Sequence, residues 1–193
     1  MRILVYDATQ ENLWREKGLS HLWRAGAFVA DFDAVIPAEN WPDACARLKK
    51  YRGEVAHLEV WSHGSSGRPW IDNDWADEAD LELLREAIEP DPDCVVWFRA
   101  CDVFQGRRGQ SFAIRATEIL GCCVVGHTRV VSQAAPGFFG ILAGFLWQSG
   151  GYGLRPGEVP QWSAADGGWS APWKRHTVSI FDRRVPRKWW QPR

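Results

Sequence analysis

Short apolar runs alternate with amphipathic segments along most of the chain. Runs rich in Val, Ile and aromatic residues predict strands, and apolar residues spaced by three or four positions predict helices. The predicted strands are 3–6, one within 27–35, 56–61, 94–99 and 122–125, and the predicted helices are 12–25, 41–51, 79–88 and 109–120. This alternation is typical of an α/β fold with a mainly parallel sheet and helices on both faces.

Local signals support the predicted helix ends. Asn40 can cap the helix that begins with Trp41 and Pro42, because proline is favoured in the first helical turn. Pro90 and Pro92 cannot continue a helix, so the helix at 79–88 ends before them.

The C-terminal part gives weaker signals. Residues 150–173 are rich in Gly and Trp and predict an ordered but irregular connection, and 177–181 predicts a last strand. No charge lies between Arg129 and Arg155, but the continuous apolar part, 138–147, is shorter than the ~20 residues of a membrane span. We expect a buried helix with loops there, and no membrane contact.

Length and cysteine content narrow the class of protein. A chain of 193 residues fills one core, so we expect a single domain over 1–193. Its five cysteines lack the regular spacing of a secreted disulfide scaffold, which indicates a reducing compartment. The first residues, MRILVYDATQ, have too short an apolar core for a signal peptide. We therefore expect a cytoplasmic protein.

Charge is distributed unevenly. Residues 1–100 carry 11 basic and 19 acidic side chains, and the rest carry 12 and 5. The acidic run at 71–93 is typical of a solvated helix face. The basic tail could contact an acidic partner protein or nucleic acid, although packing against the acidic half is simpler and nucleic acid is not expected. Its residues are Lys174, Arg175, Arg183, Arg184, Arg187, Lys188 and Arg193, with Trp189 and Trp190 among them.

Two strands end at reactive side chains. His63 follows the strand at 56–61, and Cys101 follows the strand at 94–99. The carboxyl ends of parallel strands meet at one sheet edge, so the two side chains can converge as nucleophile and acid or base. Gly64 permits a close backbone approach, and N–H groups near Cys101 can stabilise an oxyanion. Each residue alone is more often structural, and it is the pairing that favours catalysis.

The segments LEVWSHG and VVWFRAC, each an apolar strand ending in His-Gly or Ala-Cys, resemble the paired signature of caspase-like (clan CD) cysteine peptidases, bacterial caspase-fold domains included. The resemblance is clearest over 2–126. It implies a three-layer fold with strand order 2-1-3-4-5-6, a dyad of Cys101 and His63, and an oxyanion site at the backbone of Gly64 and Cys101. The chain departs from the family in lacking an obvious activation linker, and in having neither Gln nor an acidic residue before Ala-Cys.

Arg99 lies two residues before Cys101, so the strand period places both on one face. Caspases use this position to help recognise an acidic side chain, so the resemblance implies a substrate pocket at Arg99. The guanidinium needs an anion when buried, which is either the substrate or an internal carboxylate. Asp7 and Asp102 are the internal candidates, and an internal pair would leave the pocket neutral.

Other chemistry is weakly supported. There is no HExxH motif, phosphate loop or CxxC pair, and Cys94, Cys122 and Cys123 are poorly arranged as metal ligands, so we expect no metal and no cofactor. His127 is expected to be structural. The sequence thus favours a cysteine endopeptidase acting on a protein or peptide. A non-catalytic interaction module of the same fold and a thiol hydrolase or transferase of a non-peptide amide or ester remain open.

Overall fold

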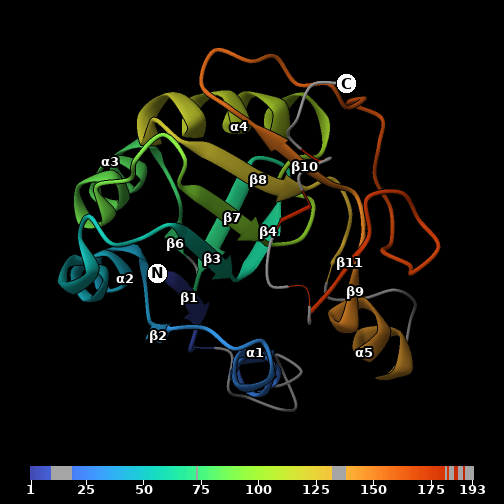
Figure 1. The fold of residues 1–193 in the computed structure, drawn as a ribbon. Helices are drawn as coiled ribbons and strands as arrows, with labels where there is room; N and C mark the ends of the chain where they lie inside the picture. Colours follow the sequence, from blue (N-terminus) through green and yellow to red (C-terminus); the bar gives the residue numbers. More distant parts are fainter. Residues whose placement is uncertain are drawn as a thin grey trace.

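The computed structural model describes residues 1–9, 19–72, 74–131, 138–180, 182, 185–186 and 189. Its centre is a six-stranded sheet in the order β10-β8-β7-β3-β1-β2, parallel except for β10 (Figure 1). The strands are β1 (Arg2–Asp7), β2 (Ala34–Ala38), β3 (His57–Trp61), β7 (Val95–Arg99), β8 (Cys123–His127) and β10 (Gly151–Leu154). The predicted order 2-1-3-4-5-6 is confirmed.

Helices cover both faces of the sheet, as predicted. One face carries α2 (Trp41–Leu48), α3 (Glu78–Ile88) and α4 (Gly106–Leu120), and a 3-10 turn, η1 (Lys49–Tyr51), follows α2. The other face carries α1 (Leu19–Val29), with α5 (Phe138–Leu146) on the same side (Figure 1). Asn40 caps α2 through a bond from the backbone N–H of Asp43, as its side chain predicted.

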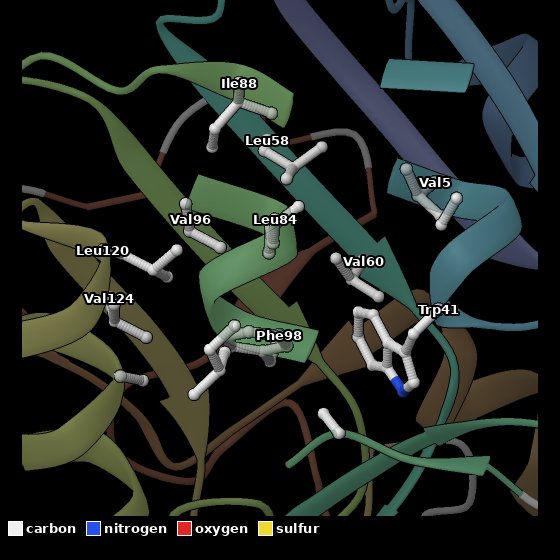
Figure 2. Close-up of a cluster of buried hydrophobic side chains, with 14 of the residues drawn as sticks. Val5, Trp41, Leu58, Val60, Leu84, Ile88, Val96, Phe98, Leu120 and Val124 are labelled. Atoms are coloured by element: carbon white, nitrogen blue, oxygen red, sulfur yellow. The ribbon is translucent and has the colours of Figure 1, made fainter. Parts of the chain in front are cut away.

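The face under α2, α3 and α4 holds the larger apolar core (Figure 2). Every second residue of each strand points into it, which is the period of an extended chain. Figure 2 shows the strand residues Val5, Leu58, Val60, Val96, Phe98 and Val124 packed with Trp41, Leu84, Ile88 and Leu120.

The opposite face mixes aromatic and charged side chains. Its two apolar clusters include Leu4, Tyr6, Trp23, Trp61 and Ile180 near α1, and Trp97, Cys123, Val125, Val178 and Trp189 further along the sheet. Glu59 and Arg99 belong to this face too, because they alternate with Leu58 and Phe98 of the main core.

The second strand begins later than the predicted segment 27–35. Helix α1 continues to Val29, and β2 starts only at Ala34. Ala27 and Ala30 are buried while Phe28 is 91% exposed, which is a helical rather than a strand pattern. Residues 12–18 of the predicted helix lie outside the described residues.

The sixth strand is not the predicted segment 177–181. It is β10, from the region expected to be irregular, and it pairs antiparallel with β8. Val178–Ser179 forms β11 instead, which pairs with β9 (Trp147–Gln148) outside the main sheet. Gly151 explains why propensity missed β10, since any Cβ there would collide with the ring of Trp189.

Helix α5 matches the predicted apolar helix but is not buried throughout, because Phe139 is 83% exposed. Within the described ranges, no helix is both long and apolar enough to cross a membrane. Sequence patterns also missed a small antiparallel sheet after β3, formed by β4 (His63–Ser65), β5 (Arg68–Ile71) and β6 (Asp74–Trp75).

Candidate active site

His63 and Cys101 occupy equivalent places at the carboxyl edge of the sheet. Trp61 of β3 is paired with Arg99 of β7, and each candidate residue lies two positions further along its chain. Neighbouring strands are ~4.8 Å apart, so this register brings the two segments level. A Cβ added at Gly64 would lie 2.7 Å from both the Cβ of Ala100 and the carbonyl oxygen of Cys101. The backbones on either side of the candidate dyad are therefore in direct contact.

Cys101 differs from the other four cysteines in its access to solvent. Cys45, Cys94, Cys122 and Cys123 are free and buried, whereas Cys101 is half-buried. Burial raises the pKa of Cys45 and of Cys123 to about 12. A hydrogen bond with Cys94, together with burial, raises the pKa of Cys122. Since the thiolate is the reactive form, the buried thiols are poor nucleophiles.

Aromatic rings hold the half-buried imidazole of His63 from two sides. Trp70, opposite His63 in the β4–β5 pair, stacks on it at 5.4 Å between ring centroids. Trp23 of α1 meets it edge-on at 5.7 Å. These contacts fix the orientation of the ring. Sequence reasoning singled out neither tryptophan, and the only signal was the presence of 13 tryptophans in the chain.

Backbone hydrogen bonds hold the turn that follows Cys101. The N–H of Asp102 donates to the carbonyl of Arg129 at 3.1 Å, and the N–H of Phe104 donates to the carbonyl of His127 at 2.8 Å. Asp102 adopts a left-handed conformation with φ of 55°. The end of β8 and the loop after it thus hold the turn that follows Cys101.

Asp102 lies next to the candidate nucleophile in a poorly solvated place. Its Oδ1 is buried without a hydrogen-bond partner in the described part of the chain. Burial raises the pKa of its carboxyl from 3.8 to about 6. Asp102 makes no ion pair with Arg99, whose partner is a different carboxylate.

Arg99 is buried and pairs with Glu59, not with either carboxylate that the sequence suggested. Its Nη1 donates to Oε2 of Glu59 at 2.9 Å, and its Nε donates to Oε1 of Gln148 at 2.6 Å. Asp7 is on the wrong face of the sheet, because it alternates with Tyr6 and follows Val5 into the main core side. Glu59 is on the face of Arg99, one strand away.

Glu59 is the centre of a buried charged network. Its Oε1 accepts from Nη2 of Arg2 at 2.8 Å, and its Oε2 accepts from Nε1 of Trp61 at 2.9 Å. Burial alone would raise the pKa of Glu59, but Arg99, His57 and Arg2 outweigh it and lower the value to about 2. Burial also lowers the pKa of Arg99, and Glu59 opposes that change.

Asp7 has a local role in the structure. It is fully buried, and its Oδ1 accepts from the backbone N–H and the hydroxyl of Thr9. Its Oδ2 accepts from the N–H of Asp72 at 3.2 Å, just after β5. These bonds tie the end of β1 to the small antiparallel sheet.

A small cavity adjoins His63. Its walls come from Trp23, Trp61, Ser62, His63, Arg99, Val131 and Gln148, and its volume is about 10 Å³, near the lower limit for one water molecule. Nη2 of Arg99 is buried and has no hydrogen-bond partner among the described residues. The guanidinium lies 4.3 Å from the ring centre of Trp97 and 5.1 Å from that of Trp61.

His127 is structural, as expected. It is fully buried, accepts from Nε1 of Trp97 at 3.1 Å and contacts the carbonyl of Ser149 through Nδ1 at 3.1 Å. Burial lowers its pKa to about 3, so the ring is neutral. Among the described residues, no three His, Cys, Asp or Glu side chains are grouped as metal ligands.

Comparison with known proteins finds a similar structure and no sequence match. No protein-family model matches the chain, and no curated protein sequence matches it. Among solved structures, the chain is similar to a secreted C11 cysteine protease from Bacteroides thetaiotaomicron in complex with an irreversible peptide inhibitor. The identity is 13%, the TM-score is 0.41, and the match covers 68% of this chain and 49% of the protease. The chain thus spans about half the length of that protease, and the functional proposal depends on the site geometry instead.

Proposed function

We propose that the chain is a cysteine endopeptidase with Cys101 as nucleophile and His63 as general acid and base. The observation that carries the proposal is the placement of the one solvent-accessible thiol of five level with an imidazole at the carboxyl edge of the sheet. Peptide substrates would reach this edge, which is where sites of open α/β sheets form.

The reaction follows from the groups present. The thiolate of Cys101 attacks the scissile carbonyl carbon and forms a C–S bond, and the charge moves to the carbonyl oxygen. Backbone N–H groups of Gly64 and Cys101 stabilise this oxyanion. The C–N bond breaks as imidazolium His63 protonates the leaving amine. His63 then takes a proton from water, which hydrolyses the thioester and frees the thiolate.

Arg99 is the substrate-binding residue in this proposal. Two guanidiniums, those of Arg2 and Arg99, share the single carboxylate of Glu59, and Nη2 of Arg99, beside the cavity, has no acceptor among the described residues. An acidic side chain before the cleaved bond would supply that acceptor. Because the cavity is small, its walls must separate for a side chain to enter.

A chloromethyl ketone or iodoacetamide probe tests the nucleophile. We expect Cys101 of the folded protein to be labelled while the other four cysteines are spared, and His63→Ala to slow the labelling near neutral pH. Cys45→Ala is the matched control and should leave labelling unchanged. Labelling of all cysteines at similar rates, or none at Cys101, contradicts the proposal.

Hydrolysis of a peptide library tests the reaction itself. Cys101→Ala and His63→Ala should each lower turnover by about 10³-fold or more, since they remove the nucleophile or its acid and base. Arg99→Lys, which keeps the charge and removes the forked donors, should weaken a preference for Asp or Glu before the cleaved bond. A parent without such a preference would leave Arg99 with a structural role only.

The closed cavity also favours a second candidate, a non-catalytic interaction module of the same fold. A protein that labels at Cys101 but cleaves no peptide, amide or ester would support it. Cleavage of esters without cleavage of peptides would indicate a thiol hydrolase of non-peptide substrates. The proposed partner contact of the basic tail falls mainly on residues outside those described.

A further inference from the structure

A groove lined by arginines lies beside the tip of the β4–β5 hairpin, away from the dyad. Two adjoining hollows, of about 570 Å³ and 330 Å³, share Gly67, Arg68 and Arg115. The first continues toward the start of α3, and the second follows the first turns of α4. We call the part bounded by Arg68, Arg107, Arg108 and Arg115 the basic groove.

The basic groove has little compensating charge of its own. Arg107, Arg108 and Arg115 recur on one exposed side of α4, and Arg68 faces them from the hairpin. Arg115 pairs with Glu78 at 3.2 Å, but both side chains are largely exposed, so the pair is weak. Within the described ranges, Arg107 and Arg108 have no ion pair. The amino end of α4 adds positive partial charge.

We infer that the basic groove binds an acidic segment of a polypeptide, and that this segment belongs to the substrate. The second half of this inference rests on the proposed peptidase function. Guanidinium groups bind carboxylates through paired donors, so a row of them selects a run of Asp or Glu.

The surroundings favour a peptide over nucleic acid. At the far end of the larger hollow, Asp77 and Glu78 add negative charge, and Glu82 and Glu86 of α3 are exposed beyond them. A long polyanion leaving the basic groove in this direction would meet repulsion, whereas a short acidic stretch would not. Trp75, which is 42% exposed and lies under the guanidinium of Arg68 at 5.4 Å, offers apolar contact to a peptide.

The hairpin sets the distance between the basic groove and the dyad. Arg68 is paired with Ser65, which is two residues beyond His63 on β4. At ~3.3 Å per residue the groove begins about 7 Å from His63, which an extended substrate covers in about two residues. The basic groove should therefore bind acidic substrate residues that begin at the second or third position from the cleaved bond, on one side of that bond.

Binding can be measured without turnover in the Cys101→Ala protein. A fluorescein-labelled peptide of six glutamates should bind, and the matched glutamine peptide should not. Arg107→Gln/Arg108→Gln should weaken binding about 5- to 10-fold, and raising the salt concentration should weaken it as well. The control Arg52→Gln/Arg85→Gln removes two exposed charges that line neither hollow, and it should change binding less than twofold. Equal effects of the two pairs overturn the inference, as does equally tight, groove-dependent binding of single-stranded DNA.

Turnover then separates the two proposals. Each test uses two substrates that differ only in a run of four residues, which are glutamates in one and glutamines in the other. The run begins at the second position from the cleaved bond, and one pair of substrates carries it before the bond while a second pair carries it after. We expect Arg107→Gln/Arg108→Gln to raise KM for the glutamate substrate alone, with kcat unchanged. Equal KM values for the glutamate and glutamine substrates in the parent overturn substrate binding by the basic groove but leave the proposed peptidase function standing. Groove-dependent binding without any turnover supports the basic groove and overturns the peptidase function.

Discussion

The two faces of the central sheet use the same strands but bury different chemistry. Under α2, α3 and α4 the strands contribute apolar side chains, such as Leu58 and Phe98, with Asp7 at the end of β1 as the charged exception. On the other face, the same strands contribute Glu59 and Arg99, which form a buried ion pair next to tryptophans. His63 and Cys101 follow two residues after Trp61 and Arg99 of that second face. We infer that the two faces have different roles, the apolar face stabilising the fold and the charged face orienting the candidate site.

Removing the carboxylate at the centre of the charged face should have the largest effect on stability. Glu59→Gln leaves the buried guanidinium of Arg99 and the part-buried guanidinium of Arg2 with a neutral partner, and we expect a loss of about 3–5 kcal/mol in the free energy of unfolding. Urea denaturation at pH 7 measures it, with the exposed Glu82→Gln as control. A loss below that of the control would mean that this face is not organised by Glu59.

The same variant should change the acid sensitivity of the fold. The pKa of Glu59 is lowered from 4.5 to about 2, so its pairing stabilises the protein above pH 4.5, and this contribution is lost as the pH falls toward 2. The stability of Glu59→Gln should therefore fall less over this range than that of the parent. Thermal unfolding between pH 2 and pH 5 checks the difference.

An equivalent cut in the apolar face should destabilise the fold without changing the site. Leu84 is 1% exposed, and Leu84→Ala should cost about 3 kcal/mol through the lost contacts and the cavity. Below its melting temperature, the rate of Cys101 labelling should equal that of the parent. Slower labelling of Cys101 in folded Leu84→Ala would contradict the proposal that the two faces have different roles.

Gly64→Ala tests the contact between the two site segments. The added Cβ would lie 2.7 Å from two atoms of residues 100 and 101, so the segments must separate at a cost of about 1–3 kcal/mol. Peptide turnover should fall strongly, because the oxyanion donors move apart. At Gly53 no described atom lies within 4 Å of the new Cβ, but φ is 76°, so Gly53→Ala loses stability through backbone strain without a clash and serves as the control for stability. Unchanged turnover in Gly64→Ala would contradict the oxyanion assignment.

The smallest expected effect concerns Asp102. The pKa of its carboxyl is raised to about 6, so the parent loses stability as the pH rises from about 4 to 6. The stability of Asp102→Asn, measured against that of the parent, should therefore be higher at pH 8 than at pH 4. Asparagine tolerates the left-handed backbone at this position. Removing the charge beside Cys101 should also shift its labelling to lower pH, because a nearby carboxylate disfavours the thiolate. An unchanged labelling profile would place the carboxylate too far away to matter.

The sequence was informative where local pattern and register agree. Short apolar runs identified β1, β3, β7 and β8, and the strand order then followed from the caspase-like resemblance. It was misleading where tertiary packing decides conformation, as at Gly151, whose lack of a side chain makes room for Trp189 in a strand of low propensity.

The partner of Arg99 shows the same limit within the site. Asp7 and Asp102 are near the strand ends, which made them the obvious carboxylates. Glu59 sits in the middle of an apolar run, where a sequence pattern gives no reason to expect a charge. Only the register of β3 against β7 reveals that Glu59 and Arg99 share a face one strand apart. Trp23 and Trp70 were missed because no sequence spacing connects them to His63.

The pairing of β3 with β7 has a consequence for the growing chain. Trp61 and Arg99 are 38 positions apart, and the turn after Cys101 is held by the carbonyls of His127 and Arg129. Such long-range pairings form slowly, after local helices. We therefore expect that a ribosome-bound chain ending before residue 127 contains both reactive side chains but no working dyad. Under the proposed peptidase function, reactivity would then arise only with the completed sheet, and the nascent chain and its neighbours would be spared premature cleavage.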